Sequence, residues 1–126
     1  MADRPRLAPR VQTFGHAFRG IGTMLATQTN ARVHALATVL VVAAGLAFGL
    51  DRAEWLAITL TIAAVWSLEA VNTAIEAICD LVSPEPNPLV KVAKDVAAGA
   101  VLIAAIGATG VGVLVFGRRL LLLAVG

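Results

Sequence analysis

Four polar side chains recur at helical spacing in residues 65–82, a stretch that is otherwise mostly apolar. They are Glu69, Asn72, Glu76 and Asp80. Because each residue of an α-helix turns by about 100°, the four side chains fall within an arc of roughly 80° on one face. An acidic residue at the centre of a bilayer costs about 2.5–3.5 kcal/mol. The sequence therefore predicts that this polar face contacts protein or water rather than lipid.

These residue types are suited to metal binding and proton transfer. Carboxylate and amide oxygens are the ligands that Mg²⁺ prefers, and crowded like charges are expected to raise the pKa of one carboxyl group, which suits a general base. Lys94 and Asp95 begin a later apolar stretch and are expected at the same end of the molecule, where a lysine can hold a phosphate oxygen. The combination is typical of metal-assisted phosphoryl transfer. The sequence contains no Walker loop and no glycine-rich kinase loop.

A small ion- or proton-conducting protein is an alternative, because proton relays also use buried acids. Such a relay needs ionisable groups through the whole depth of the membrane. Residues 96–116 contain none, which argues against this alternative.

The composition favours a membrane protein with a single domain, 1–126. Hydrophobic residues make up 59% of the chain and charged residues 14%, whereas a soluble domain has about 25% charged residues. Spanning a bilayer takes about 20 apolar residues. The sequence predicts an all-α membrane protein with transmembrane helices at 31–50, 54–82 and 92–117.

The N-terminal region is expected to form a loose tail at 1–9 and an amphipathic surface helix at 10–29. Apolar residues recur there at spacings of three and four, as in one face of a helix. They are Val11, Phe14, Phe18, Ile21 and Leu25. A helix of this pattern just before a membrane span is expected to lie in the membrane interface.

The distribution of Lys and Arg predicts the orientation. Arginines concentrate before the first span, and Lys91 and Lys94 follow the second, so the N-terminus and the loop after the second span are expected in the cytoplasm. Three spans would then place the C-terminus outside the cell. Arg118 and Arg119 argue against this placement, but the larger number of arginines before the first span outweighs them. We expect no cleavable signal peptide, no disulfide from the single Cys79, and no nucleic acid partner.

The segment EAVNTAIEAICD at 69–80 and the later AKDVAAGAVLIAA beginning at residue 93 closely resemble the bacterial diacylglycerol kinase / undecaprenol kinase family. Its pattern E-x-x-N-[ST]-x-x-E-x-x-x-D is long and specific. The resemblance includes FRGI at 18–21, NARVH at 30–34 and GLDRAEWL at 49–56, and extends over about 14–116. It implies a homotrimer with active sites shared between subunits in the bacterial cytoplasmic membrane. It also implies transfer of phosphate from ATP, with Mg²⁺, to a lipid hydroxyl at the cytoplasmic face.

The resemblance also implies roles for individual residues. Glu69 is implied as the general base for the lipid hydroxyl, and Glu76 as a metal ligand beside the ATP phosphates. Lys94, fixed by Asp95, is implied to hold the β- and γ-phosphates. The other implied site residues are Asn72, Asp80, Glu85 and Asn87 around the base and the nucleotide, and Arg32 and Arg19 on the lipid side.

Position 28 departs from the family, which commonly has a metal-binding Glu there. Gln28 can ligate through its oxygen but brings no charge. We therefore expect weaker Mg²⁺ binding, compensation by Asp95 or Asp80, or a catalytically impaired chain that acts as a membrane scaffold. The two histidines, His16 and His34, are expected to be interfacial or pairing residues rather than ligands. The sequence leaves both diacylglycerol and undecaprenol open as the lipid acceptor. It resembles the undecaprenol kinase branch of the family more closely.

Overall fold

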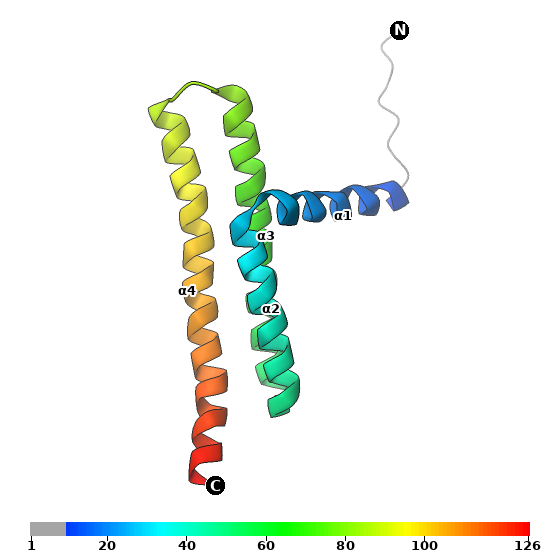
Figure 1. Ribbon diagram of the computed structural model, residues 1–126, viewed down its shortest axis with the longest axis vertical. Helices are drawn as coiled ribbons and strands as arrows, with labels where there is room; N and C mark the ends of the chain where they lie inside the picture. Colours follow the sequence, from blue (N-terminus) through cyan, green and yellow to red (C-terminus); the bar gives the residue numbers. More distant parts are fainter. Residues whose placement is uncertain (1–9) are drawn as a thin grey trace.

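The computed structural model describes residues 10–126, and within that range the chain forms four helices and no strand. The helices are α1 (Arg10–Thr27), α2 (Thr29–Phe48), α3 (Arg52–Val82) and α4 (Pro88–Val125). Helices α2, α3 and α4 form an elongated bundle, and α1 leaves it at a steep angle (Figure 1). The predicted all-α fold is confirmed. The tail predicted at 1–9 lies outside the described residues.

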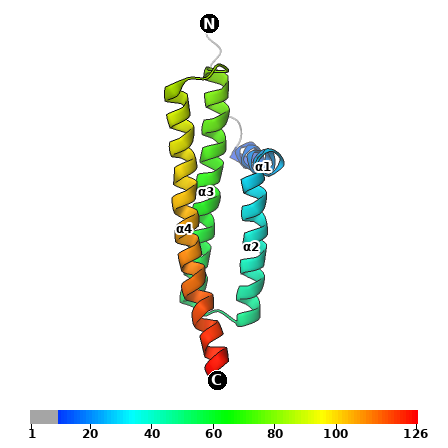
Figure 2. The same ribbon diagram turned by 60° about the vertical axis from the view of Figure 1, so that its left-hand side comes forward.

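The bundle helices differ in length, and this difference places their ends at different levels. Helices α2, α3 and α4 are long and apolar enough to cross a membrane and contain 20, 31 and 38 residues. At 1.5 Å per residue α2 is about 30 Å long, which matches the hydrocarbon core of a bilayer, while α3 is about 46 Å long. Helices α3 and α4 therefore continue well beyond the level of α1 (Figures 1 and 2).

The turn between α2 and α3 is fixed by three side-chain and backbone signals. Gly49 ends α2 in the left-handed conformation, at φ 65°, which a glycine adopts without steric cost. Asp51 then begins α3, where its Oδ1 accepts a hydrogen bond from the Glu54 backbone N–H at 2.8 Å. The Glu54 carboxylate accepts in return from the Asp51 N–H at 3.2 Å, which completes a capping box.

Helix α4 is longer at both ends than the span predicted at 92–117. It begins at Pro88 because Asn87 caps it and proline is well suited to the first helical position. It continues to Val125 because residues 118–125 contain no glycine or proline. The prolines at 84 and 86 lie in the short 83–87 connection from α3, within the loop expected after the second span.

The far end of the bundle, where the α2–α3 turn lies, is closed by a small apolar core and an ion pair. Leu50, Ile58 and Val115 are buried there. Beside them the Arg119 guanidinium bonds both oxygens of the buried Glu54 carboxylate, with Nε donating to Oε2 at 3.1 Å. The ion pair places Arg119 at the same end as the 51–54 turn and joins α4 to the start of α3.

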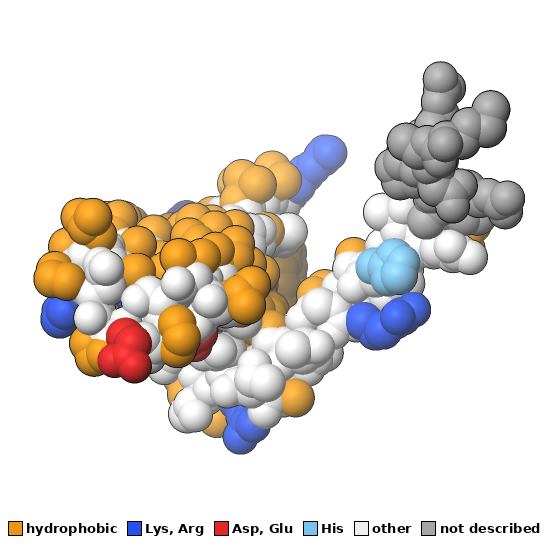
Figure 3. All heavy atoms as spheres, turned by 90° about the horizontal axis from the view of Figure 1, so that it is seen from above, with side chains coloured by type: hydrophobic (Ala, Val, Ile, Leu, Met, Phe, Trp, Pro, Cys, Tyr) orange, Lys and Arg blue, Asp and Glu red, His pale blue; other side chains and the backbone are white. Residues whose placement is uncertain are grey.

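Most of the apolar side chains on the bundle face outward. Only about a tenth to a fifth of each candidate span is buried within the chain. Hydrophobic side chains also cover much of the surface seen from above, at the end that carries the 83–87 connection (Figure 3). A single chain therefore leaves broad apolar faces for lipid or for other copies.

Removing Arg119 should destabilise the chain, because it leaves Glu54 buried without its cation. We expect Arg119→Ala to lower the Tm in detergent by more than about 3 °C. The adjacent and exposed Arg118→Ala is the matched control and should leave the Tm nearly unchanged. Equal Tm values for the two variants would show that the ion pair does not stabilise the bundle.

Candidate functional site

Glu69 is the most deeply buried large side chain in the described part of the molecule, with 1% of its surface exposed. Neither of its carboxylate oxygens has a hydrogen-bond partner among residues 10–126, and the same is true of the buried Oδ1 of Asn72. Buried polar atoms are almost always paired in native proteins. Unpaired atoms on neighbouring turns of one helix therefore mark a place built to receive something else.

The carboxylate of Glu69 borders a cavity of about 250 Å³ between three helices. Helix α3 contributes Glu69, Asn72 and Glu76, which are three of the four polar residues that the sequence placed on one helical face. Helix α2 contributes Asn30 and His34. Helix α4 contributes only apolar side chains: Ala98, Val101, Leu102 and Ala105. The prediction that this face contacts protein is confirmed for the three α3 residues that line the cavity.

Asp80, the fourth residue of the polar face, belongs to a second group near the 83–87 connection. Its Oδ1 accepts from the Lys94 Nζ at 2.5 Å, which ties the end of α3 to the start of α4. Both residues line an open cavity of about 610 Å³, together with Lys91, Glu85 and Asn87. The site predicted from sequence is therefore divided between a buried cavity at Glu69 and a solvated one at Lys94.

The prediction that Asp95 fixes Lys94 is wrong. The Lys91 ammonium donates to Asp95 Oδ2 at 2.6 Å, because the two residues are one helical turn apart on the same exposed face. Lys94 points instead toward α3, where Asp80 takes the place expected for Asp95.

Asn87 has a structural role that the sequence analysis did not assign. Its Oδ1 accepts hydrogen bonds from the backbone N–H groups of Leu89 and Val90, at 2.9 and 3.3 Å, and so caps α4. Glu85 is exposed in the same connection, and its backbone carbonyl accepts from the Ser83 hydroxyl at 2.6 Å.

The predicted residues of the α1–α2 region lie around the junction of the two helices. Arg32 donates to the carbonyls of Leu25 and Ala26, at 2.9 and 2.5 Å, and so satisfies the last turn of α1. Gln28 is the extended residue between the helices and does not line the Glu69 cavity. Arg19 lies exposed on α1.

The described residues contain no group of three or more His, Cys, Asp and Glu that could hold a metal ion. Glu76 is the half-buried acid of the Glu69 cavity, and Asn72 adds an unpaired amide oxygen beside it. Both are hard oxygen donors of the kind that Mg²⁺ takes, so one chain offers part of a ligand set.

Two polar residues of α2 line the cavity and were not predicted as site residues from the sequence. His34 lies with its Nε2 at 3.6 Å from Glu69 Oε2, and Asn30 lines the same cavity. Both residues occur in the NARVH segment, which is one of the segments that resemble the family. Arg32 was the only residue of this segment predicted to belong to the site. A histidine inside an apolar span was the available signal.

Three apolar helices that enclose a carboxylate, an amide and a histidine define a small helical membrane protein with a buried polar site. Residues 15–116 match the family described as prokaryotic diacylglycerol kinase. The undecaprenol kinase of Bacillus subtilis is 42% identical over 105 residues, which are 83% of this chain and 85% of that protein. A diacylglycerol kinase of Synechocystis sp. is 42% identical over 101 residues, 79% of this chain and 58% of that protein.

The chain therefore belongs to the prokaryotic diacylglycerol kinase family, and it is a lipid kinase. The resemblance seen in the 69–80 motif is confirmed.

The capping role of Asn87 can be tested through the stability of two variants. Asn87→Ala removes the cap of α4 and should reduce the free energy of unfolding by about 1 kcal/mol, whereas Asn87→Asp keeps an oxygen acceptor and should preserve stability. Reversible unfolding in mixed micelles measures both. Equal losses of stability in the two variants would contradict the capping role.

Proposed function

We propose that the protein transfers the γ-phosphate of ATP to the primary hydroxyl of a membrane lipid, with Glu69 as the general base. The burial of Glu69 with both oxygens unpaired, in a member of a lipid kinase family, is the observation that supports this most directly. A buried carboxylate with unpaired oxygens beside a cavity is placed to accept the proton of a hydroxyl that enters the cavity.

In the proposed step the Glu69 carboxylate takes the proton of the lipid hydroxyl. The hydroxyl oxygen forms a bond to the γ-phosphorus as the bond from that phosphorus to the β,γ-bridging oxygen breaks, and ADP leaves. Charge develops on the phosphate oxygens, so a fixed cation nearby lowers the barrier. Lys94 is the lysine that we assign to the phosphates, with Asp80 holding its ammonium group in place.

Mg²⁺ is part of this proposal, and the donor atoms of the cavity suit it. Glu76 would hold the ion with the free Oδ1 of Asn72, and Gln28 is the further candidate ligand from the α1–α2 junction. When bound, the ion would neutralise charge on the transferring phosphate. The described residues of one chain hold no group of three acidic or other metal-binding side chains, and we propose a homotrimer in which a second copy completes the ligand set.

The nucleotide is proposed to enter from the end that carries the 83–87 connection. The open cavity there combines Lys94 and Lys91 with Asp80, Glu85 and Asn87, and its polar rim suits a charged ligand. Asp95 is held by Lys91 on the outer face of α4, so its proposed contribution is to the charge around this entrance.

The membrane surface is proposed to lie at the level of α1. Phe14 and Phe18 are 69% and 72% exposed on α1, as an interfacial helix requires. Glu69 would then lie near the interface, where a lipid hydroxyl is found, and the ends of α3 and α4 would extend into the cytoplasm. Arg32 and Arg19 would face the lipid headgroups, and the N-terminus would be cytoplasmic.

Undecaprenol is the acceptor that we propose first. The match spans 85% of the undecaprenol kinase and 58% of the diacylglycerol kinase, at equal identity. Both relatives are named for acceptors that carry a primary hydroxyl, so the same chemistry serves either. A transfer assay with labelled ATP, offering both lipids with and without Mg²⁺, identifies the acceptor.

Glu69→Gln should reduce the turnover number at least about 100-fold, because a general base contributes roughly 10²–10⁴-fold. Binding of ATP should stay close to that of the unchanged protein, since Glu69 does not line the Lys94 cavity to which we assign the nucleotide. Glu54→Gln, which alters the buried carboxylate at the other end of α3, is the control and should affect stability rather than turnover of the folded protein. Full turnover in Glu69→Gln would exclude it as the base.

Lys94→Ala should raise the KM for ATP by roughly 10-fold or more, since hydrogen bonds to charged groups contribute about 1.5–3 kcal/mol. Lys91→Ala, three residues earlier and paired with Asp95, should have a smaller effect. A KM for ATP that responds equally to both changes would indicate general electrostatic attraction rather than a specific contact by Lys94.

A further inference from the structure

His34 is a titratable side chain that the structure places against Glu69. Its Nε2 lies 3.6 Å from Oε2 of the carboxylate, and the histidine is largely buried, with 19% of its side chain exposed. A separation of 3.6 Å is longer than a hydrogen bond, and an approach of roughly 0.6 Å would form one. Catalytic hydrogen bonds are often long in a free enzyme and shorten when the substrate binds.

The surroundings of Glu69 leave few other groups that could stabilise its charge. From α3 the cavity receives Asn72 and the acidic Glu76, and from α2 it receives Asn30 and His34. Helix α4 faces Glu69 with apolar side chains only. His34 is therefore the single cavity-lining residue that can carry a positive charge, and Glu76 adds a second negative one.

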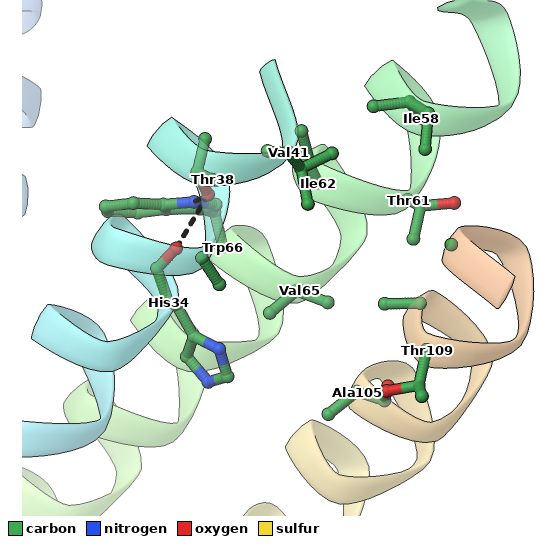
Figure 4. A pocket seen from close by; sticks show the side chains of 13 residues that line it. His34, Thr38, Val41, Ile58, Thr61, Ile62, Val65, Trp66, Ala105 and Thr109 are labelled. Atoms are coloured by element: carbon green, nitrogen blue, oxygen red, sulfur yellow. Dashed lines mark hydrogen bonds between the residues drawn. The ribbon is translucent and has the colours of Figure 1, made fainter. Parts of the chain in front are cut away.

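The backbone of α2 at His34 is fixed to α3 close to Glu69. The Thr38 hydroxyl donates to the His34 carbonyl at 2.7 Å and accepts from the indole N–H of Trp66 at 2.9 Å. Trp66 is one turn before Glu69 on α3. Figure 4 shows Thr38 and Trp66 side by side, with the His34 ring at a second pocket, which is separate from the Glu69 cavity and is not lined by Glu69. The Thr38–Trp66 pair thus connects the two helices at the level of the base.

We propose that His34 is the positioning residue of the general base. It donates its Nε2–H to Oε2 of Glu69, which fixes the orientation of the carboxylate and leaves Oε1 free for the lipid hydroxyl. This inference rests on the proposed role of Glu69. It gives an α2 residue a part in catalysis without contact to the nucleotide or the transferring phosphate.

Steady-state kinetics of histidine variants test the proposal. His34→Ala should lower kcat by between about 10- and 100-fold, less than the full contribution of a general base, and leave the KM for ATP within twofold. His34→Gln retains an N–H donor and should lose less. His16→Ala changes the other histidine of the chain, which is exposed on α1, and is the matched control. Unchanged kcat in His34→Ala, or a loss confined to KM, overturns the proposal.

Nuclear magnetic resonance of ¹⁵N-labelled histidine gives a test that does not depend on activity. The chain has two histidines, so the His34 signals are assigned by their loss in His34→Gln. Glu69→Gln should shift the Nε2 resonance of His34 and leave that of His16 in place. If the Nε2 chemical shift of His34 is the same in Glu69→Gln as in the unchanged protein, the proposed contact is wrong.

A double-variant comparison separates failure of this inference from failure of the proposed function. If His34 acts through Glu69, adding His34→Ala to Glu69→Gln should lower kcat no further than Glu69→Gln alone. Full additivity overturns the positioning role while the base assignment stands. Full activity in Glu69→Gln alone overturns the base assignment, and the proposal for His34 falls with it.

Discussion

The burial of the Glu69 carboxylate among apolar helices is the constraint on which the arrangement of this protein depends. A charge removed from water is stable only where polar groups and a fixed geometry compensate it. Helix α3 provides the amide of Asn72 on the same face, and α2 places His34 beside the carboxylate. Helix α4 covers the remaining side with small and branched apolar residues. The bundle therefore has a polar seam at Glu69, and the apolar outer faces of its helices are free to meet lipid or further copies.

Sequence periodicity predicted the helices and the polar face of α3 because both follow from local geometry. The 100° turn per residue is enough to place Glu69, Asn72 and Glu76 together, and composition is enough to indicate membrane helices. The sequence pattern was a poorer guide to which charged groups pair with each other. Lys91, Lys94 and Asp95 are close in sequence, and only the direction in which each faces α3 decides that Lys94 pairs with Asp80.

Contacts between distant segments were outside the reach of the sequence pattern. Glu54 and Arg119 are 65 positions apart, and neither residue has a neighbour that signals the pairing. The approach of His34 to Glu69 depends in the same way on how α2 and α3 are aligned. A histidine in an apolar span indicates a polar partner but does not identify it. The family motif was enough to predict the activity, but the structure was needed to show which groups surround Glu69.

The short turn between α2 and α3 has a consequence for a region far from it. Gly49 and Asp51 end one helix and begin the next with almost no free chain, so the turn sets the axial alignment of two long helices. One added residue inside α3 would advance the helix by about 1.5 Å and rotate it by about 100°, which would carry Glu69 out of the seam. The number of residues between Gly49 and Glu69 thus determines whether the Glu69 side chain faces the seam. A change of length in this segment is expected to displace Glu69, whereas the proline-rich 83–87 connection at the other end has no such alignment with α2 to preserve.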